Sequence, residues 1–149
     1  MVDINYTLEK LYEFYTPEER EQITYAYTLA AEVLKDKKRE NGHPFIEHPL
    51  GVANIVAKEI GLTYDCIVAI FLHEALRFHP TLMEEIPQGK FAPEVIDIAL
   101  NLNKIAAIKP KETRLEAENY KRLIVSFSSD PRVVIIKIAD RLEVMRNLS

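Results

Sequence analysis

This sequence has a single cysteine, no long apolar run and no excess of positive charge, and each of these features excludes a class of protein. Cys66 cannot form an internal disulfide, which is typical of a reducing compartment. The longest apolar runs are far too short to span a bilayer, and the N-terminus lacks the basic and apolar regions of a signal peptide. We therefore expect a cytoplasmic protein with no membrane partner.

The formal net charge is −4 at pH 7, whereas a domain that binds nucleic acid on its own is usually basic. We therefore expect no DNA partner, although a few local lysines and arginines would suffice for a nucleotide site. The chain has no low-complexity segment, internal repeat or flexible linker. Its 149 residues, 48% of them hydrophobic, fit one soluble domain with a real core, so we treat residues 1–149 as a single domain.

No segment shows the alternating pattern of a β-strand, and signals for helix ends recur along the chain. Thr16 and Asp130 are candidate N-caps, each followed by proline, and Gly61 can end a helix. About seven helices are expected, at residues 16–35, 49–60, 63–78, 82–86, 93–102, 115–127 and from 131 onward. The sequence thus predicts an all-α fold, an irregular multi-helix bundle, with the very apolar last helix at its centre.

Four ionisable residues stand inside strongly apolar segments: His48, the adjacent pair His73 and Glu74, and Asp140. Burying such groups is costly unless they are paired or bound to a metal. Two imidazoles and two carboxylates from separate helices would suit a divalent cation. Each residue also has a plainer interpretation: His48 as a capping or core histidine, His73 as a core histidine, and Asp140 as a structural acceptor.

Three stretches resemble signatures of the RelA/SpoT family, in the family's order over roughly residues 20–149. Residues 39–53 (RENGHPFIEHPLGVA) resemble R-x-S-G-E-P-Y-x-x-H-P-x-x-V-A. Residues 117–121 (AENYK) resemble A-E-N-[FY]-R, and residues 130–142 (DPRVVIIKIADRL) resemble D-x-R-V-x-x-I-K-L-A-D-R-L. The resemblance implies the N-terminal hydrolase domain, an HD-type all-α fold. In intact members a (p)ppGpp synthetase domain and regulatory domains follow, so we expect residues 1–149 to be an N-terminal fragment of a longer protein.

The resemblance also implies a metal site. The family's hydrolase domain holds one Mn²⁺ and cleaves the 3′-pyrophosphate from (p)ppGpp. His48, His73 and Asp140 match three of the metal ligands, and Glu74 stands where the family has an aspartate. Glutamate can ligate a metal, but its carboxylate lies one methylene farther out from the same helix. A site that needs precise distances would tolerate this poorly.

Two further acids of the family's H-D-x-x-E-D motif are absent, and Arg77 and Phe78 stand in their places. Arg77 lies three residues after Glu74, on the same helix face, and cannot ligate a metal. It would repel a divalent ion and could offer Glu74 or Asp140 a bidentate partner. We therefore hypothesise that Arg77 replaces the metal. Phe78 can neither orient nor deprotonate an attacking water, so both catalytic positions are degenerate.

The candidate nucleotide-binding residues are Lys38, Arg39 and Arg141, with Arg39 matched to the position that contacts the base in the family. The basic run at residues 35–39 fits a solvated helix end equally well. The family commonly follows D-R-L with H-N-M-R-T, which helps to hold the nucleotide, whereas residues 143–147 read EVMRN. This departure argues mildly against good nucleotide binding.

On these grounds we expect a hydrolase-inactive domain that binds no cofactor and regulates a downstream (p)ppGpp synthetase (GTP pyrophosphokinase) domain, its partner in the full-length protein. One alternative is a working Mn²⁺-dependent (p)ppGpp 3′-pyrophosphohydrolase in which Glu74 is a metal ligand. Another is a non-catalytic module that senses (p)ppGpp or another guanine nucleotide.

Overall fold

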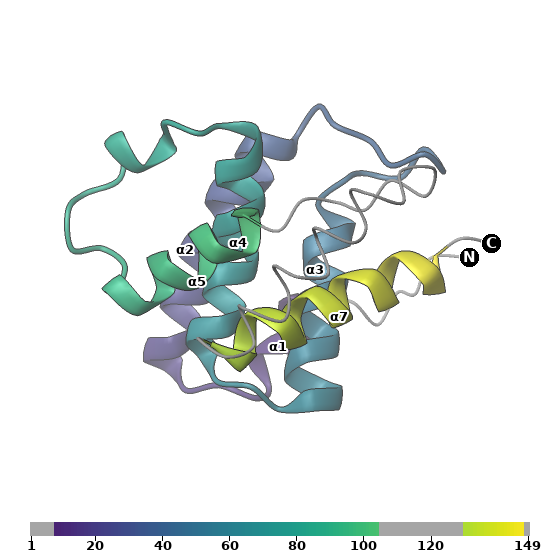
Figure 1. The fold of residues 1–149 in the computed structure, drawn as a ribbon, viewed down its shortest axis with the longest axis horizontal. Coiled ribbons are helices and arrows are strands. Elements are labelled where there is room, and N and C mark those ends of the chain that lie inside the picture. The colour runs from purple at the N-terminus through teal and green to yellow at the C-terminus, as the bar shows by residue number, and fades with distance from the viewer. Residues whose placement is uncertain (1–7, 105–129, 148–149) are drawn as a thin grey trace.

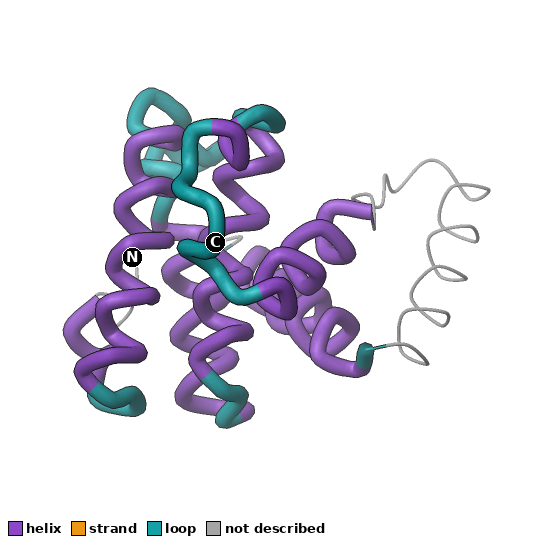
Figure 2. Tube along the Cα trace, turned by 90° about the vertical axis from the view of Figure 1, so that its left-hand side faces the viewer, coloured by secondary structure: helices purple, strands orange, loops and turns teal. Residues whose placement is uncertain are grey.

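The computed structural model describes residues 8–104 and 130–147, and this part of the chain is helical (Figures 1 and 2). Its elements are α1 (Leu8–Tyr12), α2 (Pro17–Leu34), α3 (Glu47–Asn54), the π-helix η1 (Ile55–Ile60), α4 (Tyr64–Phe78), the 3-10 turn η2 (Leu82–Glu84), α5 (Pro93–Lys104) and α7 (Pro131–Arg146). Figure 2 shows no strand in the described part, which confirms the all-α prediction. The helix predicted at residues 115–127 lies outside the described residues.

The predicted caps of α2 and α7 are confirmed. The Thr16 hydroxyl accepts a hydrogen bond from the Glu19 N–H at 3.3 Å, and the Thr16 N–H donates to the Glu19 carboxylate at 2.9 Å. Pro17 is the first helical residue. At the start of α7, the Asp130 carboxylate accepts from the Arg132 N–H at 3.1 Å. Both helices therefore begin where local backbone chemistry predicts.

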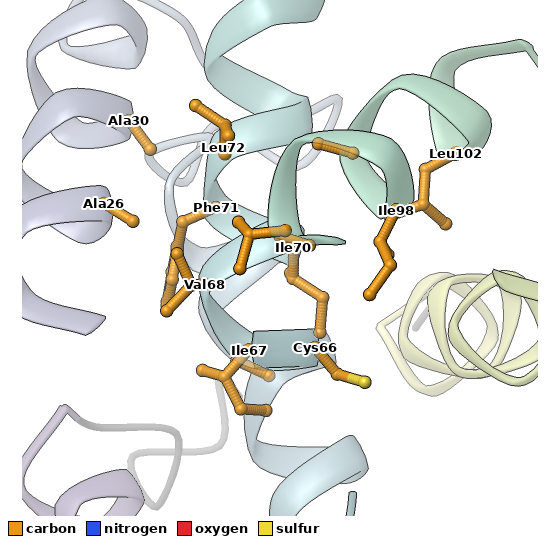
Figure 3. Packing of buried hydrophobic residues seen from close by; sticks show 14 of the residues in the cluster. Ala26, Ala30, Cys66, Ile67, Val68, Ile70, Phe71, Leu72, Ile98 and Leu102 are labelled. Carbon is orange, nitrogen blue, oxygen red and sulfur yellow. The ribbon is translucent and has the colours of Figure 1, made fainter. Parts of the chain in front are cut away.

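Helix α4 lies at the centre of the described part, packed between α2 on one side and α5 on the other (Figure 1). All its residues from Cys66 to Leu76 are buried. Figure 3 shows the apolar side chains of α4 between Ala26 and Ala30 of α2 and Ile98 of α5. Because α4 is buried on every side and mostly apolar from Cys66 to Leu76, it supplies the core that the other helices cover.

A helix as apolar as α7 is usually central to a domain, but among the described residues α7 is buried along one side only. Helix α7 buries one stripe of side chains: Val133, Ile136, Ala139 and Glu143. Its opposite side is open, with Ile138 61% and Met145 56% exposed. The helix has more apolar side chains than one packing face can cover, so hydrophobicity alone overstated its burial.

Helices α3 and η1 form one continuous rod that carries the first site residue, His48. The rod begins at Glu47, two residues before the predicted start, and ends at Gly61. Gly61 has φ 84°, and its N–H donates to the Val56 carbonyl at 2.7 Å. A positive φ is readily adopted only by glycine, which explains the predicted end of the rod.

Arg132 fixes the start of α7 against two other helices. Its guanidinium donates to Asp130 at 3.0 Å, to Asp65 of α4 at 3.0 Å and to Glu94 of α5 at 2.6 Å. This network positions α7 so that its buried stripe faces α3, with which it packs. Within the described residues, no helix combines the length and the hydropathy needed to cross a membrane.

Replacing Thr16 with alanine should lower the free energy of unfolding by about 1 kcal/mol, because α2 loses a side-chain acceptor at its N-terminus. Urea titration followed by circular dichroism measures this loss. Thr28→Ala is the matched control, because Thr28 is exposed inside the same helix. We expect it to change stability by less than about 0.5 kcal/mol. Equal losses in the two variants would contradict the capping role.

Candidate functional site

Helices α3, α4 and α7 bring the four predicted metal positions together. His48 lies in the first turn of α3, His73 and Glu74 lie near the end of α4, and Asp140 lies in the middle of α7. The charge of Glu74 acts on His48, and Asp140 and His73 act on each other. His48, His73 and Glu74 are buried, and the Asp140 side chain is 31% exposed. The tertiary fold thus assembles residues separated by up to 92 positions.

His48 makes a close contact with a carboxylate through each of its ring nitrogens. Nδ1 lies 2.5 Å from Oε1 of Glu143, and Nε2 lies 2.6 Å from Oδ1 of Asp140. Burial by itself would lower the pKa of His48, but the hydrogen bonds to the two carboxylates raise it to about 9. Burial would likewise raise the pKa values of Asp140 and Glu143, yet their contacts with His48 lower both. A pKa of about 9 favours the protonated ring at pH 7, in which each nitrogen carries a hydrogen for the carboxylate that it contacts.

Glu143 is the most heavily bonded residue of this network. Arg39 donates to its two carboxylate oxygens through Nη1 and Nη2, each at 2.8 Å. The Asn147 amide donates to Oε2 at 2.8 Å. With His48, four N–H groups converge on a side chain that is 1% exposed. A buried carboxylate is costly unless it is paired in this way.

Sequence reasoning did not identify Glu143 as a site residue. Glu143 was noted only as one of several departures from the residues that follow D-R-L in the family. A local signal was nevertheless present, because Glu143 lies seven residues after Ile136 on the buried stripe of α7. An acid at that spacing must face the protein interior and needs a cationic partner.

His73 is held by a reciprocal pair of hydrogen bonds with Asn103 of α5. The Asn103 amide donates to the His73 carbonyl at 3.0 Å, which turns its Oδ1 toward Nδ1 of His73 at 3.1 Å. Nδ1 is therefore the protonated nitrogen, and burial lowers the pKa of His73. Its other nitrogen, Nε2, keeps a lone pair and lies 3.8 Å from Oε1 of Glu74.

Within the described part of the chain, only one of the two carboxylate oxygens of Glu74 has a hydrogen-bond partner. Its Oε1 lies 3.4 Å from Nη1 of Arg77, while its Oε2 is buried without a hydrogen-bond partner among the described residues. The Arg77 side chain is 51% exposed and reaches Glu74 through one nitrogen only, so the predicted bidentate pair with Glu74 is wrong. Asp140 likewise takes His48 as its partner. Arg77 thus pairs with Glu74 as expected, but it does not fill the centre of the site.

A second cation, Lys137, lies near the same carboxylates. Burial lowers the pKa of Lys137, while the charges of Asp140 and Glu74 act in the opposite direction. Lys137 precedes Asp140 by one helical turn, so both side chains project from neighbouring positions of α7. Sequence reasoning assigned Lys137 no role, although it belongs to the family-like stretch. Positive charge in the site therefore comes from several side chains.

Phe78 takes part in an aromatic contact. Its ring packs edge-to-face against Phe45, with centroids 5.5 Å apart, and Phe45 in turn packs against His48 at 5.8 Å. Lys37 and Arg77 lie over the Phe78 ring at 4.6 and 5.0 Å. The position that holds an acid in the resembling family is therefore filled by packing, with no group that accepts a proton.

The three predicted nucleotide-binding residues do not form one surface. Arg39 is 12% exposed and committed to Glu143. Lys38 and Arg141 are exposed. Arg141 precedes Glu143 by two residues, about 200° around α7, and so lies on the opposite side of the helix from the Arg39 contact. Nucleotide binding by these residues stays a prediction.

The donor set does not fit the Mn²⁺ that the resemblance implies. Each ring nitrogen of His48 lies against a carboxylate oxygen, so neither faces an open coordination position. Across residues 8–104 and 130–147, no group of three His, Cys, Asp or Glu side chains is arranged to hold a metal ion. Of the four positions, His73 keeps a lone pair on Nε2, and Oε2 of Glu74 is buried without a hydrogen-bond partner among the described residues. The arrangement favours ion pairs over metal coordination.

Comparison with known proteins places this geometry in context. Residues 26–149 match the family model of the HD domain. The chain is 39% identical over 147 residues to guanosine-3′,5′-bis(diphosphate) 3′-pyrophosphohydrolase of Aquifex aeolicus, and 33% identical over 145 residues to the bifunctional (p)ppGpp synthase/hydrolase SpoT of Escherichia coli. It is 32% identical over 136 residues to a probable GTP pyrophosphokinase of Mycobacterium leprae.

These alignments cover 99%, 95% and 91% of this chain, but only 20%, 20% and 17% of the three relatives. The chain therefore spans about a fifth of the length of the curated relatives it matches.

The buried Arg39–Glu143 pair can be tested against the exposed Arg146–Glu59 pair, which is also bidentate, at 2.7 and 2.9 Å. Glu143→Gln should lower the free energy of unfolding by about 3–5 kcal/mol, because Arg39 is left buried without its anion and His48 keeps only Asp140. Glu59→Gln should cost less than about 1 kcal/mol, since water solvates Arg146. Urea titration of both variants measures the difference. Equal, small losses would mean that the buried network contributes little.

Proposed function

Because this chain belongs to the RelA/SpoT family through its HD domain, we propose that it is a hydrolase-inactive domain that regulates a (p)ppGpp synthetase in the same polypeptide. One observation carries the proposal: both ring nitrogens of His48 contact carboxylates, at 2.5 and 2.6 Å. A metal ligand must direct a lone pair at the ion. With His48 engaged in this way, the site lacks one of the two imidazoles that a Mn²⁺ centre would use.

The positions next to the predicted metal ligands support the same proposal. Hydrolysis requires a group that orients or deprotonates water beside the metal. Phe78 packs against Phe45, and Arg77 contacts Glu74. A guanidinium stays protonated at any physiological pH and cannot serve as a general base. The chemistry of water activation therefore has no residue to perform it at either position.

The regulatory part of the proposal comes from the relatives. The relatives include a synthase/hydrolase and GTP pyrophosphokinases, and the matched region is about a fifth of their length. We infer that the polypeptide containing this domain also carries a GTP pyrophosphokinase domain, which transfers pyrophosphate from ATP to GTP or GDP. A domain without hydrolase activity would act on such a neighbour through contacts.

A second candidate function is a working Mn²⁺-dependent (p)ppGpp 3′-pyrophosphohydrolase. The unpartnered, buried Oε2 of Glu74 and the lone pair on Nε2 of His73 favour it, because these two atoms have the electronic form of metal ligands. Several relatives are also named as hydrolases. A third candidate, a (p)ppGpp sensor, would use the exposed Lys38 and Arg141.

The first test measures bound metal and pyrophosphate release after the purified protein is incubated with excess Mn²⁺ and ppGpp. We expect neither in the wild type. A quadruple variant returns four positions to the family's residues: Glu74→Asp/Arg77→Glu/Phe78→Asp/Glu143→His. This variant should gain Mn²⁺ binding, because Glu143 no longer holds His48. If Arg77 by itself replaces the metal, Glu74→Asp/Arg77→Glu is enough to restore Mn²⁺ binding. The matched control for Glu143 is Glu74→Asp/Arg77→Glu/Phe78→Asp, which should stay weak because it keeps Glu143.

One bound Mn²⁺ and released pyrophosphate in the wild type would establish the hydrolase candidate and refute the inactive one. Binding of ppGpp by isothermal titration calorimetry, without turnover, would identify a sensor. Circular dichroism of each variant verifies that the helices are retained.

The regulatory role predicts that the GTP pyrophosphokinase activity of the full-length protein changes when residues 1–149 are removed. The physical reason is that a domain acting through contacts biases its neighbour between conformations, and the bias disappears with the domain. The rate of ppGpp synthesis is measured with and without the domain at equal molar concentration. An unchanged rate would contradict regulation, whatever the result with Mn²⁺.

A further inference from the structure

Four N–H donors from three parts of the chain converge on the two oxygens of Glu143. Arg39 supplies two at 2.8 Å, His48 one at 2.5 Å and Asn147 one at 2.8 Å. A planar guanidinium with an imidazole and an amide is the donor set by which proteins bind phosphate and carboxylate ligands. Here the bound carboxylate belongs to the protein itself, and it is 1% exposed.

The donors are held in place by contacts that do not involve the Glu143 carboxylate. The Arg39 N–H donates to the His43 carbonyl at 2.8 Å, and the Gly42 N–H donates to the Arg39 carbonyl at 2.9 Å. Gly42 has φ 87°, the left-handed conformation that lets this loop turn back on itself. The backbone of Arg39 is therefore fixed independently of its ion pair.

Asn147 and His48 are also held in place by contacts other than those with the Glu143 carboxylate. The Asn147 amide also donates to the backbone carbonyl of residue 143, one turn earlier, at 2.9 Å. His48 is anchored on its far side by Asp140 at 2.6 Å and by the Phe45 ring. Removing the Glu143 side chain would leave three pre-positioned groups around an empty volume.

We propose that Arg39, His48 and Asn147 form an anion-binding cradle and that the Glu143 carboxylate is its tethered occupant. The cradle accepts small oxyanions, carboxylate or phosphate, once Glu143 is removed. In the wild type Glu143 excludes them and keeps the phosphate groups of nucleotides away from Arg39. The exclusion of nucleotide phosphates by Glu143 rests on the proposed function. The anion-binding cradle is argued from the hydrogen-bond geometry alone, so one claim can fail without the other.

Charge balance favours an anion over water as the new occupant. Arg39 is a permanent cation, and Glu143 is the buried carboxylate that pairs with it at 2.8 Å. Without Glu143, one buried positive charge lacks a counter-ion. Water would satisfy some of the N–H groups but would not neutralise that charge.

The experiment is chemical rescue of Glu143→Ala, with sodium acetate and inorganic phosphate as probes and sodium chloride at equal ionic strength as the reference. We expect acetate or phosphate at about 100 mM to raise the thermal midpoint of the variant by roughly 5 °C or more over chloride, because each binds only the folded protein. The wild type should respond to these anions as it does to chloride, since its cradle is filled.

Glu59→Ala is the matched control, because it removes a carboxylate from the equally bidentate but exposed Arg146. It should show no anion-specific rise. Arg39→Gln/Glu143→Ala should lose the rise seen in Glu143→Ala. If Glu143→Ala does not fold in buffer, the osmolyte TMAO restores compact structure without filling a specific site, and the anion response is measured in its presence.

An anion-specific rise that depends on Arg39 establishes the cradle, and the better of the two anions identifies the ligand class. No rise with either anion, or the same rise in Glu143→Ala and Glu59→Ala, overturns it. Because the test involves neither Mn²⁺ nor ppGpp, it is independent of the hydrolase assay.

Discussion

A carboxylate that is buried away from water needs hydrogen-bond donors around it. The donors around the buried Glu143 carboxylate hold together separate parts of the fold. These donors come from the loop before α3, from α3 and from the end of α7. The buried pairs therefore join segments about 100 residues apart in the chain. They also orient His48, because its Nδ1 contacts Glu143 while its Nε2 contacts Asp140. The packing of α7 on α3 and the chemistry of the site thus depend on one side chain.

Side-chain cations balance the acids that the family resemblance assigns to a divalent ion. His48 lies between Asp140 and Glu143, Arg39 pairs with Glu143, and Lys137 lies near Asp140. Organic cations neutralise carboxylates as a metal does, but they neither polarise a phosphate oxygen nor lower the pKa of a bound water. Such an exchange would keep the fold around the site and remove the means of hydrolysis. This is the physical basis for the proposal that the domain acts through contacts.

Glu74 and His73 are not paired with side-chain cations in the way that Asp140 and Glu143 are. Oε2 of Glu74 is buried without a partner in the described part of the chain, and Nε2 of His73 keeps its lone pair because Asn103 holds the opposite nitrogen. An unsatisfied buried oxygen destabilises a protein, so its presence demands a reason. The two candidate functions explain Oε2 of Glu74 differently. In a working hydrolase this oxygen would be a metal ligand, whereas in an inactive domain it would be a former ligand position that no side-chain cation has filled.

Local chemistry in the sequence determined where helices begin and end, because caps such as Thr16 and Asp130 act within one turn of the backbone. It also indicated that His48 and Asp140 converge, since polar groups in apolar segments must meet a partner. It did not reveal that the partner of His48 is Glu143, or that α4 rather than α7 forms the centre of the core. Those outcomes depend on which faces of distant helices meet. The partner of a buried charge is set by tertiary packing, because packing decides which oppositely charged side chain is removed from water beside it.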